Sequence, residues 1–154
     1  MFTITTPETM NSFGQFVAKE LRAGDVVCLT GELGAGKTTF TRGLGAALNV
    51  RGSVTSPTFV IARTHARTDG PPLVHVDAYR LGTAGELDDI DVDWENSITV
   101  VEWGSTMLGA LVDDWLNIVI DRSVSDADDV RTVRIEPHGA RASEIAEFIK
   151  GWTE

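Results

Sequence analysis

The sequence predicts an α/β fold with a mainly parallel central sheet, antiparallel additions and flanking helices. Short apolar runs typical of strands alternate with longer segments in which apolar residues recur at helical spacing. One run, residues 26–30, passes through a glycine-rich turn directly into a helix-like segment that starts at Lys37. Strand–helix units of this kind build parallel sheets. The chain has 154 residues, which suits one such core, so we expect a single domain over residues 1–154.

The first half of the chain supplies the first two strands and helices. Residues 2–5 alternate as a strand does, and a threonine followed by a proline then begins a helix over 7–21. The apolar residues of that helix have helical spacing and should face the sheet. A buried strand over 26–30 and a helix over 37–48 follow.

Strands dominate the second half, with one more helix at the end. The expected segments are 59–64 and 73–77, which could pair as a hairpin, then 97–102, 115–121 and 130–136, and a helix over 140–152.

Residues 31–38 read Gly-Glu-Leu-Gly-Ala-Gly-Lys-Thr, the pattern of a phosphate-binding loop. Glycines let the backbone bend around an anion and present N–H groups to it at a helix N-terminus. Lys37 should reach the β- and γ-phosphates, Thr38 should offer its hydroxyl to Mg²⁺, and Thr39 should lie close to the α-phosphate. The loop therefore predicts a P-loop NTPase-type domain. The expected nucleotide-binding residues are Gly31, Glu32, Leu33, Gly34, Ala35, Gly36, Lys37, Thr38 and Thr39.

Hydrolysis also requires a magnesium site and a group that positions the attacking water. Asp77 and Glu102 each end a predicted strand, and open parallel sheets bind ligands at that edge, so both acids could reach one Mg²⁺. Each acid could instead cap a strand end or form a surface ion pair. We assign the metal to Thr38, Glu102 and Asp77.

Two further residues join the candidate catalytic set. Thr58 follows the helix of the phosphate loop, where nucleotide switches keep a hydroxyl that senses the γ-phosphate; the alternative is a hydroxyl at the start of a strand. Arg80 could stabilise phosphoryl charge, or form a surface salt bridge. His75, two residues before Asp77, is expected to be structural. The catalytic set is Lys37, Asp77, Glu102, Thr58 and Arg80.

Composition restricts the partners and the location. The net charge of −10 works against direct binding of nucleic acid, so any connection to RNA should pass through a partner protein. Cys28 is the only cysteine, so no intrachain disulfide can form, and a reducing compartment fits best. No apolar stretch is long enough to span a bilayer, and we expect a cytoplasmic protein. The acidic segment 86–95 is either a solvated face or a docking surface for a basic partner.

The motifs together resemble the TsaE family, formerly known as YjeE. The matching blocks are 31–43, then Ser-Pro-Thr-Phe at 56–59, then His-Val-Asp-Ala-Tyr-Arg-Leu at 75–81, and Val-Glu-Trp at 101–103. The resemblance extends over roughly residues 2–136.

The resemblance implies a bacterial Mg²⁺-dependent ATPase, slow without its partners, that acts with TsaB and TsaD. These proteins form threonylcarbamoyladenosine at position 37 of tRNAs that read codons beginning with A, with tRNA contacted mainly by the partners. Lys37 would then bind phosphate, Thr38 and Glu102 would hold Mg²⁺, and Asp77 would position water or act as an indirect metal partner. Family members often carry Glu or Gln where this chain has Ser105. Arg131 is a further candidate ATP contact.

Two other functions remain open at this point. A P-loop small-molecule kinase would need a lid carrying arginines, and residues 84–96 contain neither Arg nor Lys. An ATP-binding switch with little hydrolysis would share the same loop. The chain lacks the Asn-Lys-x-Asp tetrapeptide of guanine recognition after its phosphate loop, so ATP is the expected nucleotide.

Overall fold

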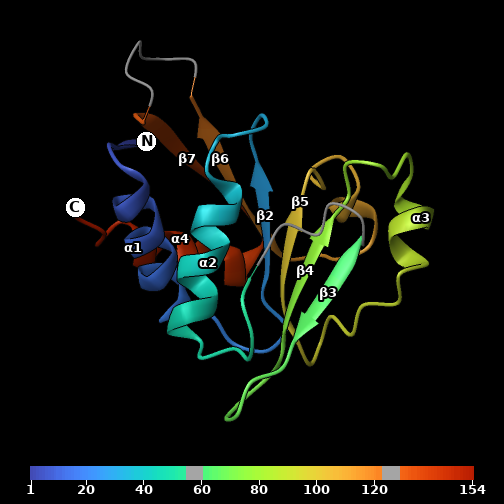
Figure 1. Cartoon of the computed structure of the whole chain (residues 1–154). Coiled ribbons are helices and arrows are strands. Elements are labelled where there is room, and N and C mark those ends of the chain that lie inside the picture. The colour runs from blue at the N-terminus through green and yellow to red at the C-terminus, as the bar shows by residue number, and fades with distance from the viewer. Residues whose placement is uncertain (55–60, 123–128) are drawn as a thin grey trace.

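The computed structural model describes residues 1–54, 61–122 and 129–154, which form a seven-stranded sheet with helices on both faces (Figure 1). In chain order the elements are β1 (Phe2–Ile4), α1 (Pro7–Ala18), β2 (Val26–Thr30), α2 (Lys37–Ala47), β3 (Ala62–His65), β4 (Leu73–Asp77), α3 (Ala84–Asp88), β5 (Ile98–Glu102), the 3-10 helix η1 (Leu108–Ala110), β6 (Trp115–Asp121), β7 (Arg131–His138) and α4 (Ala140–Ile149). None of the helices in the described ranges is long and apolar enough to cross a membrane.

The sheet has a parallel centre and antiparallel edges, which confirms the predicted fold class. Its strand order is β1-β7-β6-β2-β5-β4-β3. Strands β6, β2, β5 and β4 run parallel to their neighbours in this central group. At the edges β7 joins β6, β1 joins β7, and β3 joins β4, all antiparallel. The expected hairpin is present, with Ala62 opposite Val76 and His65 opposite Leu73.

Side-chain alternation along β2 divides the core between the two faces of the sheet. Val27 and Leu29 point into the larger core, which α1, α2 and α4 cover. Val26 and Cys28 point into a smaller core on the other face, beneath α3 and η1. This alternation is the period of two that a strand imposes. Cys28 is fully buried, and burial raises the pKa of its thiol to about 11.

Helix α2 is held closely against α1, and this contact fixes the helix that begins at the phosphate loop. Gly14 of α1 lies so near α2 that a Cβ on it would overlap the backbone carbonyl of Phe40. Phe13 and Phe40 pack at the same crossing, with ring centroids 5.4 Å apart. The start of α2 is therefore positioned by packing against a second helix as well as against the sheet.

Two helices end three residues before the sequence-based expectation, and α2 ends one residue before it, at Ala47. Helix α1 ends at Ala18 rather than residue 21, because the amides of Lys19, Glu20 and Leu21 bond to carbonyls three residues back. That tight turn still buries Leu21. Helix α4 likewise ends at Ile149. The amides from Lys150 to Trp152 then bond to carbonyls three residues back.

The acidic segment that follows β4 begins with the short helix α3, capped by the Thr83 hydroxyl that accepts from the Glu86 amide. Its carboxylates at 86, 88, 89, 91, 93 and 95 are all exposed. This exposure is common to both expectations for the segment, a solvated face and a docking surface for a basic partner.

Candidate nucleotide-binding site

The phosphate loop connects the end of β2 to the start of α2, at the edge of the sheet where the parallel strands end (Figure 1). Gly34 and Gly36 have φ angles of 81° and 114°, in the left-handed region that strains other residues. Gly36 is also the N-cap of α2 and provides no side chain to bond the first helical amides. No side chain of a described residue caps those amides, so they are available to an anion.

Two arginines from the neighbouring strands hold the outer side of the loop. Arg131 of β7 donates from Nε to the Ala35 carbonyl at 3.0 Å and from Nη2 to the Gly34 carbonyl at 3.1 Å. Arg122, just after β6, donates from Nη1 to the Leu33 carbonyl at 3.2 Å. A trans peptide places each C=O opposite the next N–H. The amides of Gly34 and Gly36 are thus turned away from the arginines.

Lys37 is almost fully buried at the first position of α2. Its ammonium donates to the Gly31 carbonyl at 2.6 Å and lies over the Trp103 ring. Burial lowers the pKa of Lys37, and the negative charges of Glu102 and Asp77 partly counteract that shift. The lysine therefore shares one electrostatic environment with both acids predicted to serve the metal.

Asp77 and Glu102 lie side by side, as the sequence predicted. They are register partners at the carboxyl ends of the parallel strands β4 and β5, and Glu102 is also the partner of Leu29 in β2. Glu102 is buried, with 4% of its surface exposed, while Asp77 is half-buried. The Oδ1 atom of Asp77 accepts from the Tyr79 amide at 3.0 Å. Both carboxylates thus lie at the edge that carries the phosphate loop.

The described residues contain no group of three or more His, Cys, Asp or Glu side chains arranged to hold a metal. The predicted set fits a different kind of site, because it offers two carboxylates and the hydroxyl of Thr38. Mg²⁺ is commonly held by one or two carboxylates together with phosphate oxygens and water. The oxygen donors of the predicted residues are therefore compatible with a Mg²⁺ ion that is bound together with a nucleotide.

The other predicted residues have different outcomes. Thr58 lies outside the described residues. Arg80 is exposed and forms neither a hydrogen bond nor an ion pair with any described residue. Glu32 and Leu33 stand at the exposed tip of the loop, whereas Ala35 is buried. Thr39 lines a cavity of about 130 Å³ together with Thr6, Pro7, Met10, Gly34, Ala35, Gly36, Asp129 and Arg131.

Sequence reasoning did not assign the aromatic pair beside Lys37. Trp103 is half-buried with a φ of 64°, and its ring meets Tyr79 edge-on at 5.2 Å between centroids. The observed contact with Lys37 places the ring at the candidate site. Tyr79, 69% exposed, was not singled out.

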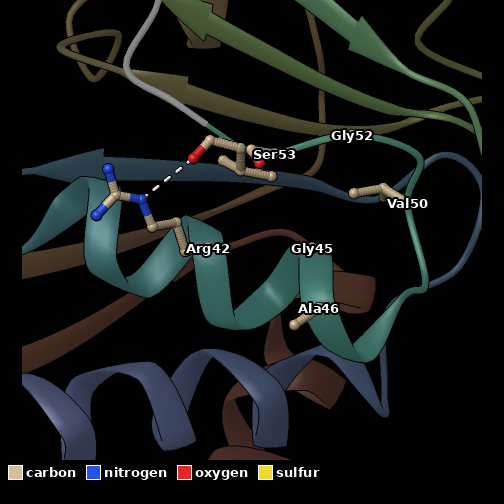
Figure 2. A pocket seen from close by; sticks show the side chains of 7 residues that line it. Arg42, Gly45, Ala46, Val50, Gly52 and Ser53 are labelled. Atoms are coloured by element: carbon tan, nitrogen blue, oxygen red, sulfur yellow. Dashed lines mark hydrogen bonds between the residues drawn. The ribbon is translucent and has the colours of Figure 1, made fainter.

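Helix α2 also contacts the chain where it enters the segment that contains Thr58. Arg42 donates from Nε to the carbonyl of Val54 at 3.1 Å (Figure 2). This bond lies beside an open hollow of about 460 Å³, which Gly45, Ala46 and Val50 also line. The bond from Arg42 thus connects residue 54 to α2, the helix that begins at the phosphate loop.

A strand, a glycine-rich Gly-Lys-Thr loop and a helix on a mainly parallel sheet, with acids ending the adjacent strands, define a P-loop NTPase-type nucleotide-binding protein. The family model for threonylcarbamoyl adenosine biosynthesis protein TsaE matches residues 4–132. The chain belongs to the TsaE family, as its motifs indicated.

Individual relatives agree with this assignment. The tRNA threonylcarbamoyladenosine biosynthesis protein TsaE of Streptomyces coelicolor is 58% identical over 137 residues, covering 86% of this chain and 93% of that protein. The protein of the same name from Bacillus subtilis is 35% identical over 145 residues, covering 92% and 87%. The crystal structure of Bacillus subtilis YdiB has a TM-score of 0.77 and 29% identity, and covers 97% of this chain and 92% of that one.

Proposed function

We propose that the protein is a single-domain, Mg²⁺-dependent ATPase in tRNA modification. Acting with TsaB and TsaD, it would support formation of the threonylcarbamoyl group on adenosine 37 of tRNAs reading codons that start with A. Membership of the TsaE family supports the pathway. The observation that carries the chemical part is the grouping of Lys37, Asp77 and Glu102 at the end of the phosphate loop.

The loop and its surroundings provide separate positions for the parts of ATP. Free amides of the loop and the first turn of α2 would bind the phosphates, and Lys37 would neutralise the β- and γ-phosphates. Thr39 lines the cavity that also contains Thr6 and Arg131, and we assign this cavity to the nucleoside end of the ligand. A bound ATP would thus extend from the two acids, at its γ-phosphate, toward the start of α1, at its nucleoside.

Thr38 and Glu102 would hold Mg²⁺, with Asp77 beside them. The ion would supply positive charge to the phosphate oxygens. Asp77 would orient the attacking water, since hydrolysis of a phosphoanhydride depends mainly on positioning and charge stabilisation. Lys37 is withdrawn from water, and a desolvated charge acts more strongly on a developing negative charge.

The surface charge supports an indirect connection to tRNA. The chain carries 23 acidic against 13 basic side chains, and proteins that hold nucleic acid directly need clustered Lys and Arg. A partner that binds tRNA would supply that contact. ATP hydrolysis would then act on the partner assembly, and we expect the isolated protein to hydrolyse ATP slowly.

The test measures ATP hydrolysis by the protein with Mg²⁺, first alone and then with purified TsaB and TsaD. The proposal expects slow Mg²⁺-dependent hydrolysis that the partners alter, together with modified tRNA over repeated turnovers. Phosphorylation of a metabolite in the absence of the partners would instead establish a kinase. Single-turnover hydrolysis at the background rate with both partners present would establish a binding switch.

A further inference from the structure

A buried histidine contacts the carboxylate that we assign to the metal. His75 lies on β4 and is completely buried, and its Nε2 atom is 2.6 Å from Oε2 of Glu102. Glu102 ends the adjacent strand β5. In this contact the imidazole N–H donates and the carboxylate oxygen accepts. The sequence indicated only a structural role for this histidine.

The carboxylate of Glu102 has one hydrogen-bond donor among the described residues, and that donor is His75. Lys37 is close enough to influence it electrostatically, but the lysine ammonium is hydrogen-bonded to the Gly31 carbonyl. Oε2 of Glu102 is therefore occupied, whereas Oε1 makes no hydrogen bond to a described residue. A single short bond from a buried ring restricts the rotation of the carboxylate and leaves one oxygen for an outside cation.

We propose that His75 is a positioning residue, which through its bond to Oε2 fixes the Glu102 carboxylate for binding Mg²⁺. The inference rests on the proposed assignment of Glu102 to the metal. Residues that hydrogen-bond a ligating side chain fix its orientation, and their loss commonly weakens metal affinity about 10- to 100-fold. His75 acts through Glu102, so its effect on the metal must disappear when that carboxylate is removed.

His65 provides a matched control. It is the other buried histidine of the β3–β4 hairpin, 8% exposed, and its Nε2 has no hydrogen-bond partner among the described residues. Replacing either histidine perturbs packing in the same part of the sheet. Only His75 touches a carboxylate of the candidate site, so only its replacement should change the metal affinity.

The experiment compares His75→Asn, His75→Gln and His65→Asn with the wild type. Calorimetry measures ADP binding with and without Mg²⁺, electron paramagnetic resonance measures Mn²⁺ binding in the presence of ADP, and thermal unfolding monitors stability. We expect His75→Asn to weaken divalent-ion affinity about 10- to 100-fold and to leave metal-free ADP binding unchanged. His75→Gln, whose longer amide can donate in place of Nε2, should stay near the wild type. His65→Asn should alter stability alone.

Wild-type divalent affinity in His75→Asn, or an equal loss in His65→Asn, would overturn the inference. His75→Asn leaves the buried Glu102 carboxylate without its hydrogen-bond donor. Should this variant fail to fold for that reason, Glu102→Ala and the double variant Glu102→Ala/His75→Asn replace it, because both lack the carboxylate. These two must then bind the ion equally well, and a difference between them overturns the inference. A wild type whose nucleotide binding ignores Mg²⁺ would instead refute the proposed function.

Discussion

The ammonium nitrogen of Lys37 lies 3.7 Å from the centre of the Trp103 ring. An aromatic face attracts a cation, most strongly where water is excluded. Together with the Gly31 carbonyl, the ring holds the buried ammonium, and no ion pair joins Lys37 to an acid among the described residues. Neither Asp77 nor Glu102 is therefore paired with Lys37. Both carboxylates can bind another cation, which agrees with the proposed metal site.

Replacing Lys37 with alanine should abolish tight ATP binding or lower hydrolysis about 10²- to 10³-fold, the usual cost of one preorganised electrostatic contact. Nucleotide titration and single-turnover hydrolysis measure the change. Lys150→Ala is the control, since that lysine is exposed at the C-terminal end of α4 and pairs with Glu147. Unchanged ATP affinity and rate in Lys37→Ala would remove this residue from the site.

The stability of the nucleotide-free protein should depend on pH through Lys37. Burial lowers its pKa from the ordinary 10.5, so between the folded and unfolded pKa values the unfolded chain binds more protons. Stability then rises with pH in that window, because the ammonium no longer has to be buried in its charged form. Lys37→Met lacks this group.

We therefore expect Lys37→Met to be more stable than the wild type at pH 7, with a smaller difference at pH 10. Urea unfolding of both proteins at the two pH values measures the difference in free energy. If the difference in unfolding free energy between Lys37→Met and the wild type stays constant or widens from pH 7 to pH 10, burial of the charged Lys37 ammonium does not destabilise the folded protein.

Glu102→Ala should raise the Mg²⁺ concentration needed for half-maximal hydrolysis and lower the rate at saturation, because the ion loses a direct carboxylate. The rate is expected to fall about 10²-fold. Mg²⁺ titrations of the ATPase rate give both quantities. Glu95→Ala, in the exposed acidic segment, should leave the titration unchanged, and an equal effect in the two variants would indicate a general loss of negative charge.

Arg131→Ala should weaken nucleotide binding, because the Arg131 side chain holds the phosphate loop and also lines the cavity that we assign to the nucleoside end. Two loop carbonyls lose their donors, so the loop has to be ordered by the ligand itself. Charged hydrogen bonds of this kind contribute about 1.5–3 kcal/mol when well formed, and with partial solvent screening we expect about a tenfold loss of ADP affinity.

Arg134→Ala is the matched control for Arg131→Ala, because it lies on the same strand and pairs with Glu136 at the surface. Calorimetry of ADP binding compares the two. Equal affinities would show that the loop keeps its conformation without Arg131.

The residues that could be predicted are those whose type is dictated by local chemistry. The phosphate loop needs glycines, a lysine and a hydroxyl at fixed spacing, and Asp77 and Glu102 each follow an apolar strand. Their proximity followed from one general property of parallel sheets, which bind ligands at the carboxyl ends. The central strands and the hairpin could be located because their apolar runs are short and are bounded by turn residues.

The contacts that sequence reasoning missed depend on which strands are neighbours. Arg131 reaches Gly34 across 97 positions of the chain, and it can do so only because β7, β6 and β2 are consecutive in the sheet. The bond between His75 and Glu102 similarly requires β4 next to β5. Composition and periodicity identify strands, but they do not specify this order. Arg131 was expected only as an ATP contact, and basic residues at the ends of strands flanking a phosphate loop are the signal that would have suggested its bonds to the loop, and those of Arg122.

The burial of Cys28 makes the single thiol an internal reporter of the sheet. Its side chain is inaccessible in the middle of β2, the central strand that leads into the phosphate loop, and burial raises its pKa to about 11, which disfavours the thiolate further. Thiol reagents react with the exposed thiolate. The folded protein should consequently resist alkylation, and any labelling measures how often β2 opens. One chemical modification rate, with and without ADP, would then report how strongly a bound nucleotide protects the centre of the sheet.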